Sequence, residues 1–126
     1  DCCDNFATRH AVNVACVAAK VPLVSGAVMG WEGQVASFDS RQISSPCYHC
    51  LFPQGDADDG WRCATFGVVA PLVGMVGSLQ ASEAIKMLLG VGTSLVGKLW
   101  RVDARDWRTH IVRVPRDTAC MVCSSH

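Results

Sequence analysis

Charge is scarce in this sequence and has no excess of either sign. Charged residues make up 17% of the 126 residues, and 11 basic side chains are balanced by 11 acidic ones. A chain without a basic excess lacks the positive field that attracts nucleic acids and anionic membrane surfaces. We therefore expect neither nucleic acid nor a membrane among the partners of this protein.

Patterns of secretion and of membrane insertion are also missing. The first residues do not show a basic segment followed by an apolar one, which a signal peptide requires. The longest apolar run, residues 66–79, is shorter than the ~20 residues of a spanning helix and contains Pro71. Four of the eight cysteines are irregularly spaced, as free thiols are in a reducing compartment. These observations favour a cytoplasmic protein.

Apolar residues, by contrast, are abundant. They make up 50% of the chain, which is enough for a core at this length. The chain opens abruptly on Asp1-Cys-Cys-Asp-Asn5, which is typical of the end of a strand. We therefore interpret residues 1–126 as the C-terminal part of one longer domain.

Hydrophobic periodicity predicts two long helices. The first covers residues 6–19, with Asp4 or Asn5 as its N-cap. Its expected apolar face consists of Ala11, Val12, Ala15, Cys16 and Ala19, and its expected wetter face of Arg9, His10 and Asn13. The second covers residues 69–89, with Pro71 in its first turn and Gly90 or Gly92 at its end. Its first half is apolar all round, which predicts burial in the fold or against a second subunit.

Four segments have the composition of strands. Residues 21–29 are nearly continuously apolar and residues 32–39 alternate, as in the two strands of a hairpin. Residues 98–103 and 109–114 form a second hairpin, and residues 40–61 are expected to be a loop. This order of elements predicts an α/β fold with a mixed sheet whose later strands are antiparallel.

Two Cys-x-x-Cys pairs, separated by most of the chain, carry the clearest chemical signal. Cys47 and Cys50 form the first pair, and Cys120 and Cys123 form the second. Four thiolates in two short turns can close a tetrahedral shell around Zn²⁺, which is typical of a structural site. Two disulfides, or one thioredoxin-like redox pair, are the alternatives. Because nothing else suggests secretion, and neither pair lies between a strand and an expected helix, we predict a peripheral zinc clasp.

Several motifs occur in order along the chain and together are specific for one family. They are Asp1-Cys-Cys-Asp-Asn5 followed by Arg9 and Asn13, Pro46-Cys-Tyr-His-Cys-Leu-Phe-Pro53, Gly67-Val-Val-Ala-Pro-Leu-Val-Gly74, Gly77-Ser-Leu-Gln-Ala81, Glu83-Ala-Ile-Lys86 and the terminal Cys120-Met-Val-Cys123. Over essentially all of its length, the chain resembles the C-terminal half of the ThiF/MoeB/HesA group of E1-like adenylating enzymes of sulfur-carrier proteins.

This resemblance implies a Rossmann-like fold and an ATP-dependent, Mg²⁺-dependent reaction. The family adenylates the C-terminal Gly-Gly carboxylate of a ubiquitin-like sulfur carrier, which then becomes a thiocarboxylate for molybdopterin or thiamin synthesis. Its members are usually homodimers. The family's glycine-rich nucleotide loop lies in the N-terminal half, which is absent from this sequence, so we expect residues 1–126 alone to be inactive.

The resemblance also suggests roles for three residues. Asp4, with Asp1 beside it, matches the family aspartate that helps to hold Mg-ATP, and carboxylate oxygens suit Mg²⁺. The alternatives are an N-cap for Asp4 and a surface carboxylate for Asp1. Cys63 matches a cysteine that can bond to the activated carrier in some members, and its alternative is a small buried residue.

Two further functions remain open from the sequence. In one, the chain is a non-catalytic, zinc-stapled module for dimerisation and carrier docking. In the other, it belongs to a thiol-dependent sulfurtransferase centred on Cys63 that needs no ATP.

Overall fold

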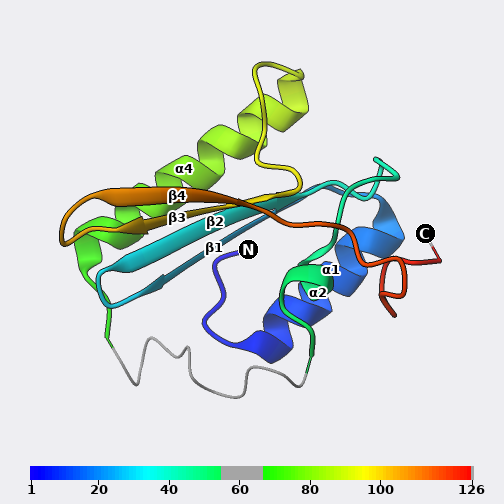
Figure 1. Cartoon of the computed structure of the whole chain (residues 1–126), viewed down its shortest axis with the longest axis horizontal. Helices are drawn as coiled ribbons and strands as arrows, with labels where there is room; N and C mark the ends of the chain where they lie inside the picture. The colour runs from blue at the N-terminus through cyan, green and yellow to red at the C-terminus, as the bar shows by residue number, and fades with distance from the viewer. Residues whose placement is uncertain (55–66, 126) are drawn as a thin grey trace.

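The computed structural model describes residues 1–54 and 67–125, and it shows a four-stranded sheet with helices on both faces (Figure 1). In chain order the elements are α1 (Phe6–Ala19), β1 (Leu23–Met29), β2 (Glu32–Phe38), α2 (Tyr48–Leu51), α4 (Ala70–Leu89), β3 (Lys98–Asp103) and β4 (Arg108–Arg113). The two long helices and the four strands are confirmed, with bounds within about two residues of those predicted. The short helix α2 was not predicted, because residues 40–61 were expected to be loop.

Alternate side chains of the central strands divide the interior into two cores. On one face, Val35 of β2 and Val102 of β3 pack with Leu72 and Val76 of α4. On the opposite face, beside α1 and α2, the buried cluster consists of Leu23, Ala36, Phe38, Tyr48, Leu99 and Val114. This alternation follows from the period of two along a strand. Helices α1 and α2 cover the second core, while Asp1 lies beside the edge strand β1.

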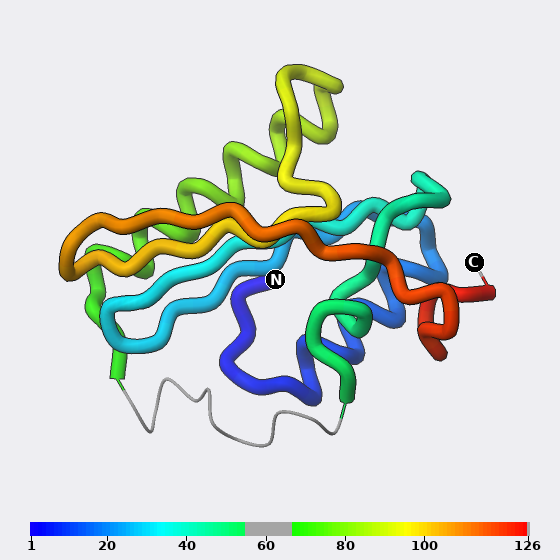
Figure 2. Tube along the Cα trace, in the orientation of Figure 1, coloured from blue at the N-terminus to red at the C-terminus, as the bar shows by residue number. Residues whose placement is uncertain are grey.

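All pairings between the named strands are antiparallel. The strands lie in the order β1-β2-β3-β4, so the two predicted hairpins stand side by side in one sheet (Figure 2). Among the described residues, parallel pairing is limited to two isolated bridges and to Asp1, which lies beside β1. The amino group of Asp1 donates to Val24 O, and its backbone oxygen accepts from Gly26 N. The prediction of antiparallel later strands is confirmed, but the prediction of a mixed sheet was too broad for the named strands.

The buried face of α1 is largely polar, which contradicts part of the predicted orientation of this helix. Arg9, His10, Asn13 and Val17 are buried, whereas Ala11, Ala15 and Ala19 are exposed. Val12 and Cys16 pack against the core, as predicted. The polar side chains turn inward because backbone groups of neighbouring segments lie there and need partners. Burial, and then the nearby His49, lower the pKa of His10, which favours its neutral form. The predicted cap is confirmed, since Asn5 Oδ1 accepts from Thr8 N at 2.8 Å.

Helix α4 crosses the other face of the sheet and also buries polar side chains. Pro71 lies in its first turn and Gly90 caps its end in the left-handed conformation, as predicted. By length and composition alone α4 could cross a membrane, a test that core helices also pass. Its buried Glu83 argues against a span, because the carboxylate accepts from Ser37 Oγ, Lys86 Nζ and Leu95 N.

Gly26 of β1 allows α4 to approach the sheet closely. A Cβ atom at this position would lie 2.2 Å from Gln80 Oε1. Gln80 is itself buried, and its Nε2 donates to Asp1 O at 2.9 Å and to Val24 O at 3.3 Å. Because these bonds hold the amide in place, the contact between Gly26 and Gln80 fixes the distance from α4 to β1.

We therefore expect Gly26→Ala to lower the free energy of unfolding by about 1–3 kcal/mol, through overpacking against Gln80. The control is Thr8→Ala, at an exposed position of α1. That change should raise stability by about 0.5 kcal/mol, because alanine is the better helix former. Urea unfolding of the two variants measures both effects, and equal stability of Gly26→Ala and the parent protein would contradict the account.

Candidate functional site

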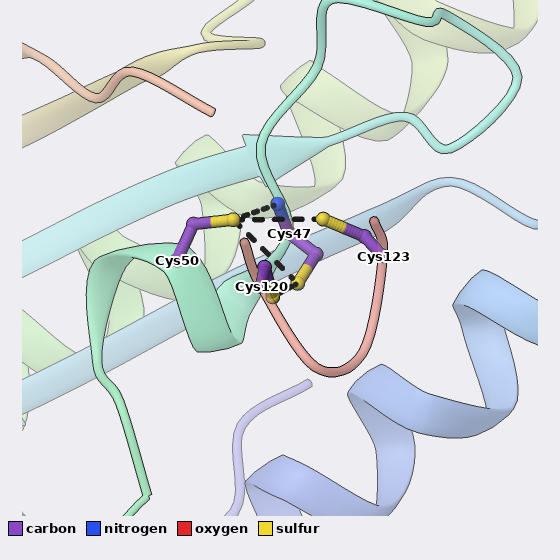
Figure 3. Close-up of side chains that lie close together, drawn as sticks. All are labelled: Cys47, Cys50, Cys120 and Cys123. Atoms are coloured by element: carbon purple, nitrogen blue, oxygen red, sulfur yellow. Dashed lines mark hydrogen bonds between the residues drawn. The ribbon is translucent and has the colours of Figure 1, made fainter. Parts of the chain in front are cut away.

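The structure brings the four predicted cysteines together. Cys47 caps the start of α2 and Cys50 lies within it, while Cys120 and Cys123 come from the C-terminal tail (Figure 3). Their sulfur atoms all lie within 4.8 Å of one another. The two pairs meet through Cys47 Sγ and Cys120 Sγ at 3.7 Å, and through Cys50 Sγ and Cys123 Sγ at 3.6 Å. The cluster thus joins two segments that are distant in the chain.

These distances fit a metal ion better than they fit disulfides. A tetrahedron with metal–sulfur bonds of about 2.3 Å has edges between sulfur atoms of about 3.8 Å. Three separations within the cluster, 3.6, 3.7 and 4.0 Å, lie close to that edge, whereas a disulfide bond is about 2.0 Å long. Four soft sulfur donors without an oxygen ligand suit Zn²⁺.

Burial of the cluster affects the charge of its thiols. Cys47, Cys120 and Cys123 are 2%, 2% and 5% exposed. Burial raises the pKa of Cys47 and of Cys123 above the ordinary thiol value, because a lone thiolate is poorly solvated there. A divalent cation would supply the missing charge compensation and displace these protons. The donor set, its separations and its burial are therefore all consistent with a closed metal site.

Three neighbouring side chains hold the cluster from outside. Asn13 of α1 donates through Nδ2 to Cys47 Sγ at 3.5 Å and accepts at Oδ1 from Tyr48 N at 3.0 Å. Val17, one turn later, packs against the sulfur atoms. Arg116 donates to the backbone oxygens of Ile43 and Cys123, and so ties the tail to the loop before Cys47.

The predicted nucleotide-binding residues lie in the turn before α1, and the two aspartates differ in exposure. The side chain of Asp1 is 0% exposed, its Oδ1 accepts from Cys3 N, and Arg9 lies 3.9 Å from its Oδ2. Asp4 is exposed, and its Oδ1 accepts from Asn5 Nδ2 at 3.4 Å. Of the two carboxylates, only Asp4 is open to a ligand that approaches from solvent.

Arg9 holds this turn against the sheet. Its guanidinium donates to Cys3 O, to Gly26 O at 3.0 Å and to Ser25 Oγ at 3.2 Å. Arg9 and Asn13 are four residues apart on one face of α1, so a single helix carries the supports of both the Asp1–Asn5 turn and the cysteine cluster. The sequence analysis placed both residues on the wetter face of this helix; their spacing of four was the available signal of a shared face. Cys63 lies outside the described residues.

The chain matches curated proteins along nearly its whole length. It is 46% identical over 123 residues to the molybdopterin-synthase adenylyltransferase of Escherichia coli (strain K12), a match that covers 98% of this chain and 49% of that protein. It is 41% identical over 125 residues to the sulfur carrier protein ThiS adenylyltransferase of the same organism, covering 98% of this chain and 48% of that protein. The chain therefore spans about half the length of these relatives.

Solved structures and a family model give consistent matches. E. coli MccB, in a crystal structure with ATP, superposes with a TM-score of 0.74 at 19% identity, over 94% of this chain and 37% of that one. The heterocyclase TruD gives a TM-score of 0.73 at 13% identity, over 97% and 21%. At these identities the likeness shows the fold alone. The model of the ThiF family matches residues 1–122. The chain belongs to the ThiF family.

Proposed function

We propose that this chain is part of an enzyme that adenylates a ubiquitin-like sulfur-carrier protein. The observation that carries the proposal is its 41–46% identity to proteins named as adenylyltransferases for molybdopterin synthase and for the carrier ThiS. In this reaction the carrier's C-terminal Gly-Gly carboxylate attacks the α-phosphate of ATP and pyrophosphate leaves. ATP and Mg²⁺ are the cofactors that the reaction requires. The pathway that this reaction would serve is molybdopterin or thiamin synthesis, and a cytoplasmic location stays a prediction.

Asp4 is the residue that we propose to act on Mg-ATP from this part of the protein. Its exposure and its hard oxygen donors support the role. Asp1, which is buried and faces Arg9, would support the same turn from behind. The remaining parts of the nucleotide site are proposed to come from the residues of the full-length protein that precede this chain.

Exchange of labelled pyrophosphate into ATP by the full-length protein, in the presence of the carrier, tests this role. We expect Asp4→Asn to lower the exchange rate by about 100-fold, the typical effect of removing one group that stabilises developing charge. Asp106→Asn, at an exposed carboxylate of the β3–β4 turn, is the matched control and should leave the rate unchanged. No exchange by the unmodified protein would contradict adenylation itself. Normal exchange by Asp4→Asn would contradict only the assigned residue.

The same assay separates adenylation from the sulfurtransferase alternative. If the protein adenylates its carrier, the Cys63→Ala variant should still exchange pyrophosphate, because formation of the acyl-adenylate needs no cysteine. A sulfurtransferase centred on Cys63 would show no exchange before or after the change. We propose that Cys63 acts only after adenylation, when its thiol would bond to the activated carrier.

We further propose that Cys47, Cys50, Cys120 and Cys123 hold a structural Zn²⁺. Support comes from the sulfur separations of 3.6–4.0 Å and from the absence of oxygen donors in the set. The full shell leaves no open position for a substrate, so the ion would fasten the tail to α2 and would take no part in the chemistry.

We expect one zinc per chain, measured by elemental analysis of the native protein beside a count of reactive thiols. Cys120→Ser should abolish stoichiometric binding, because three thiolates hold zinc far more weakly than four. Cys2→Ser, at an exposed cysteine outside the cluster, should bind zinc as the parent does. Metal-free protein with all four cluster thiols reactive would contradict the zinc proposal and leave the adenylation proposal untouched.

A homodimer is the oligomeric state that we propose, with α4 at the contact. The solvent face of α4 exposes several large apolar side chains, namely Val73, Met75, Ile85, Leu88 and Leu89. Lys86, paired with Glu83 at the edge of this face, is the one partly exposed charge of the helix. A largely apolar face of this length on an exterior helix is typical of a surface that a partner covers. The same observation supports the alternative function, a non-catalytic dimerisation and docking module.

Sedimentation of the full-length protein tests the dimer. Ile85→Glu should shift the mass from dimer to monomer, because it places a charge in the centre of the apolar face. Ile43→Glu changes an isoleucine that is 87% exposed in the loop after β2 and should leave the mass unchanged. A parent protein that sediments as a monomer would exclude the α4 contact.

A further inference from the structure

We infer that Asn13 is a positioning residue of the cysteine cluster, which it supports from α1 by an N–H···S bond. The inference rests on the proposed metal site and deepens it, because it assigns a residue that lies 34 positions from the nearest ligand. Asn13 belongs to neither Cys-x-x-Cys turn, so the spacing of the cysteines does not predict its role.

The surroundings of Asn13 leave its amide few alternative partners. The residue is 1% exposed, and its two side-chain hydrogen bonds both go to the start of α2. Oδ1 accepts from the backbone N–H of Tyr48, and Nδ2 donates to the sulfur of Cys47. A buried amide has an acceptor at one end and donors at the other. Asn13 therefore satisfies a donor and an acceptor at once, namely the N–H of Tyr48 and the sulfur of Cys47.

The bond to sulfur is unusual in this cluster. Among residues 1–54 and 67–125, Asn13 is the one residue other than the four cysteines whose side chain hydrogen-bonds to a cluster sulfur. Four thiolates around one divalent cation leave a net negative charge, and a donor N–H beside one sulfur compensates part of it. The donor also fixes the direction of the Cys47 side chain toward the other three sulfur atoms.

The bond to Tyr48 orients the backbone of the same turn. Tyr48 N is the first amide of α2, and the amides of the first turn have no acceptor within their own helix. Asn13 supplies that acceptor from a separate helix, at an amide that an N-cap side chain does not normally reach. Because Cys47 and Cys50 lie on either side of this amide, its orientation sets the geometry of the first ligand pair.

Metal affinity of the full-length protein provides the test, with Co²⁺ as the probe. Each variant is titrated in competition with a chelator, and the thiolate-to-cobalt absorption bands are recorded. Asn13→Ala removes both bonds. Asn13→Asp keeps the size and the acceptor for Tyr48, but it removes the N–H donor and adds a negative charge. Val17→Ala is the matched control, because Val17 lies one turn later on α1 and contacts the cluster only through packing.

We expect both Asn13 variants to bind Co²⁺ roughly 10–100-fold more weakly, the usual effect of losing an outer partner of a ligand. Their charge-transfer bands should shift, because Cys47 loses a donor, while Val17→Ala keeps the position of the bands. If Asn13→Ala does not fold, Asn13→Asp decides the question alone.

Two other results would overturn the inference. Parental affinity and parental bands in Asn13→Asp would show that the N–H···S bond has no role. Equal weakening in Asn13→Ala and Val17→Ala, with unshifted bands, would reduce Asn13 to packing. Absence of Co²⁺ and Zn²⁺ binding by the parent protein would instead contradict the metal proposal on which the inference rests.

Discussion

The hydrogen bonds that Arg9 and Asn13 make from the buried face of α1 are the constraint on which both candidate sites depend. Arg9 holds the Asp1–Asn5 turn against β1, and Asn13 holds the turn that begins at Cys47. Removing one partner of a buried hydrogen bond costs about 1–3 kcal/mol, which is more than the bond itself contributes. The bonds of Arg9 and Asn13 therefore favour one position for each of the two turns. Because both residues belong to α1, the helix also sets the separation of the turns.

Helix α4 uses the same device on the opposite face of the sheet. Gln80 bonds to the backbone oxygens of Asp1 and Val24, and Glu83 accepts from Ser37 and from the amide of Leu95. A buried carboxylate is tolerated when several donors satisfy its oxygens, as Lys86 also does here. The N-terminal turn is thus held from α1 on one side of the sheet and from α4 on the other. These contacts give a segment without regular secondary structure a defined position beside β1.

Local rules predicted the elements of this fold well and the roles of their faces less well. Caps and periodicity located α1 and α4, and alternation located the hairpins, because these signals lie within each segment. The buried face of α1 was misjudged because periodicity assumes that apolar residues turn inward, whereas Arg9 and Asn13 find their partners in other segments. The four-residue helix α2 is too short to show a period. The cysteine cluster was predictable from spacing alone, but the difference between buried Asp1 and exposed Asp4 depends on tertiary contacts.

The cysteines that meet in the cluster lie 73 residues apart in the chain. Closing a loop of that size from an unfolded chain costs entropy that grows with the logarithm of its length. The sheet closes nearly the same loop beforehand, since Ala36 of β2 pairs with Leu99 of β3. The cysteines are therefore close together once the strands have paired, so binding of the proposed ion would be a late step that orders only the last residues. Loss of that ion would release the tail first, while the strands stay paired.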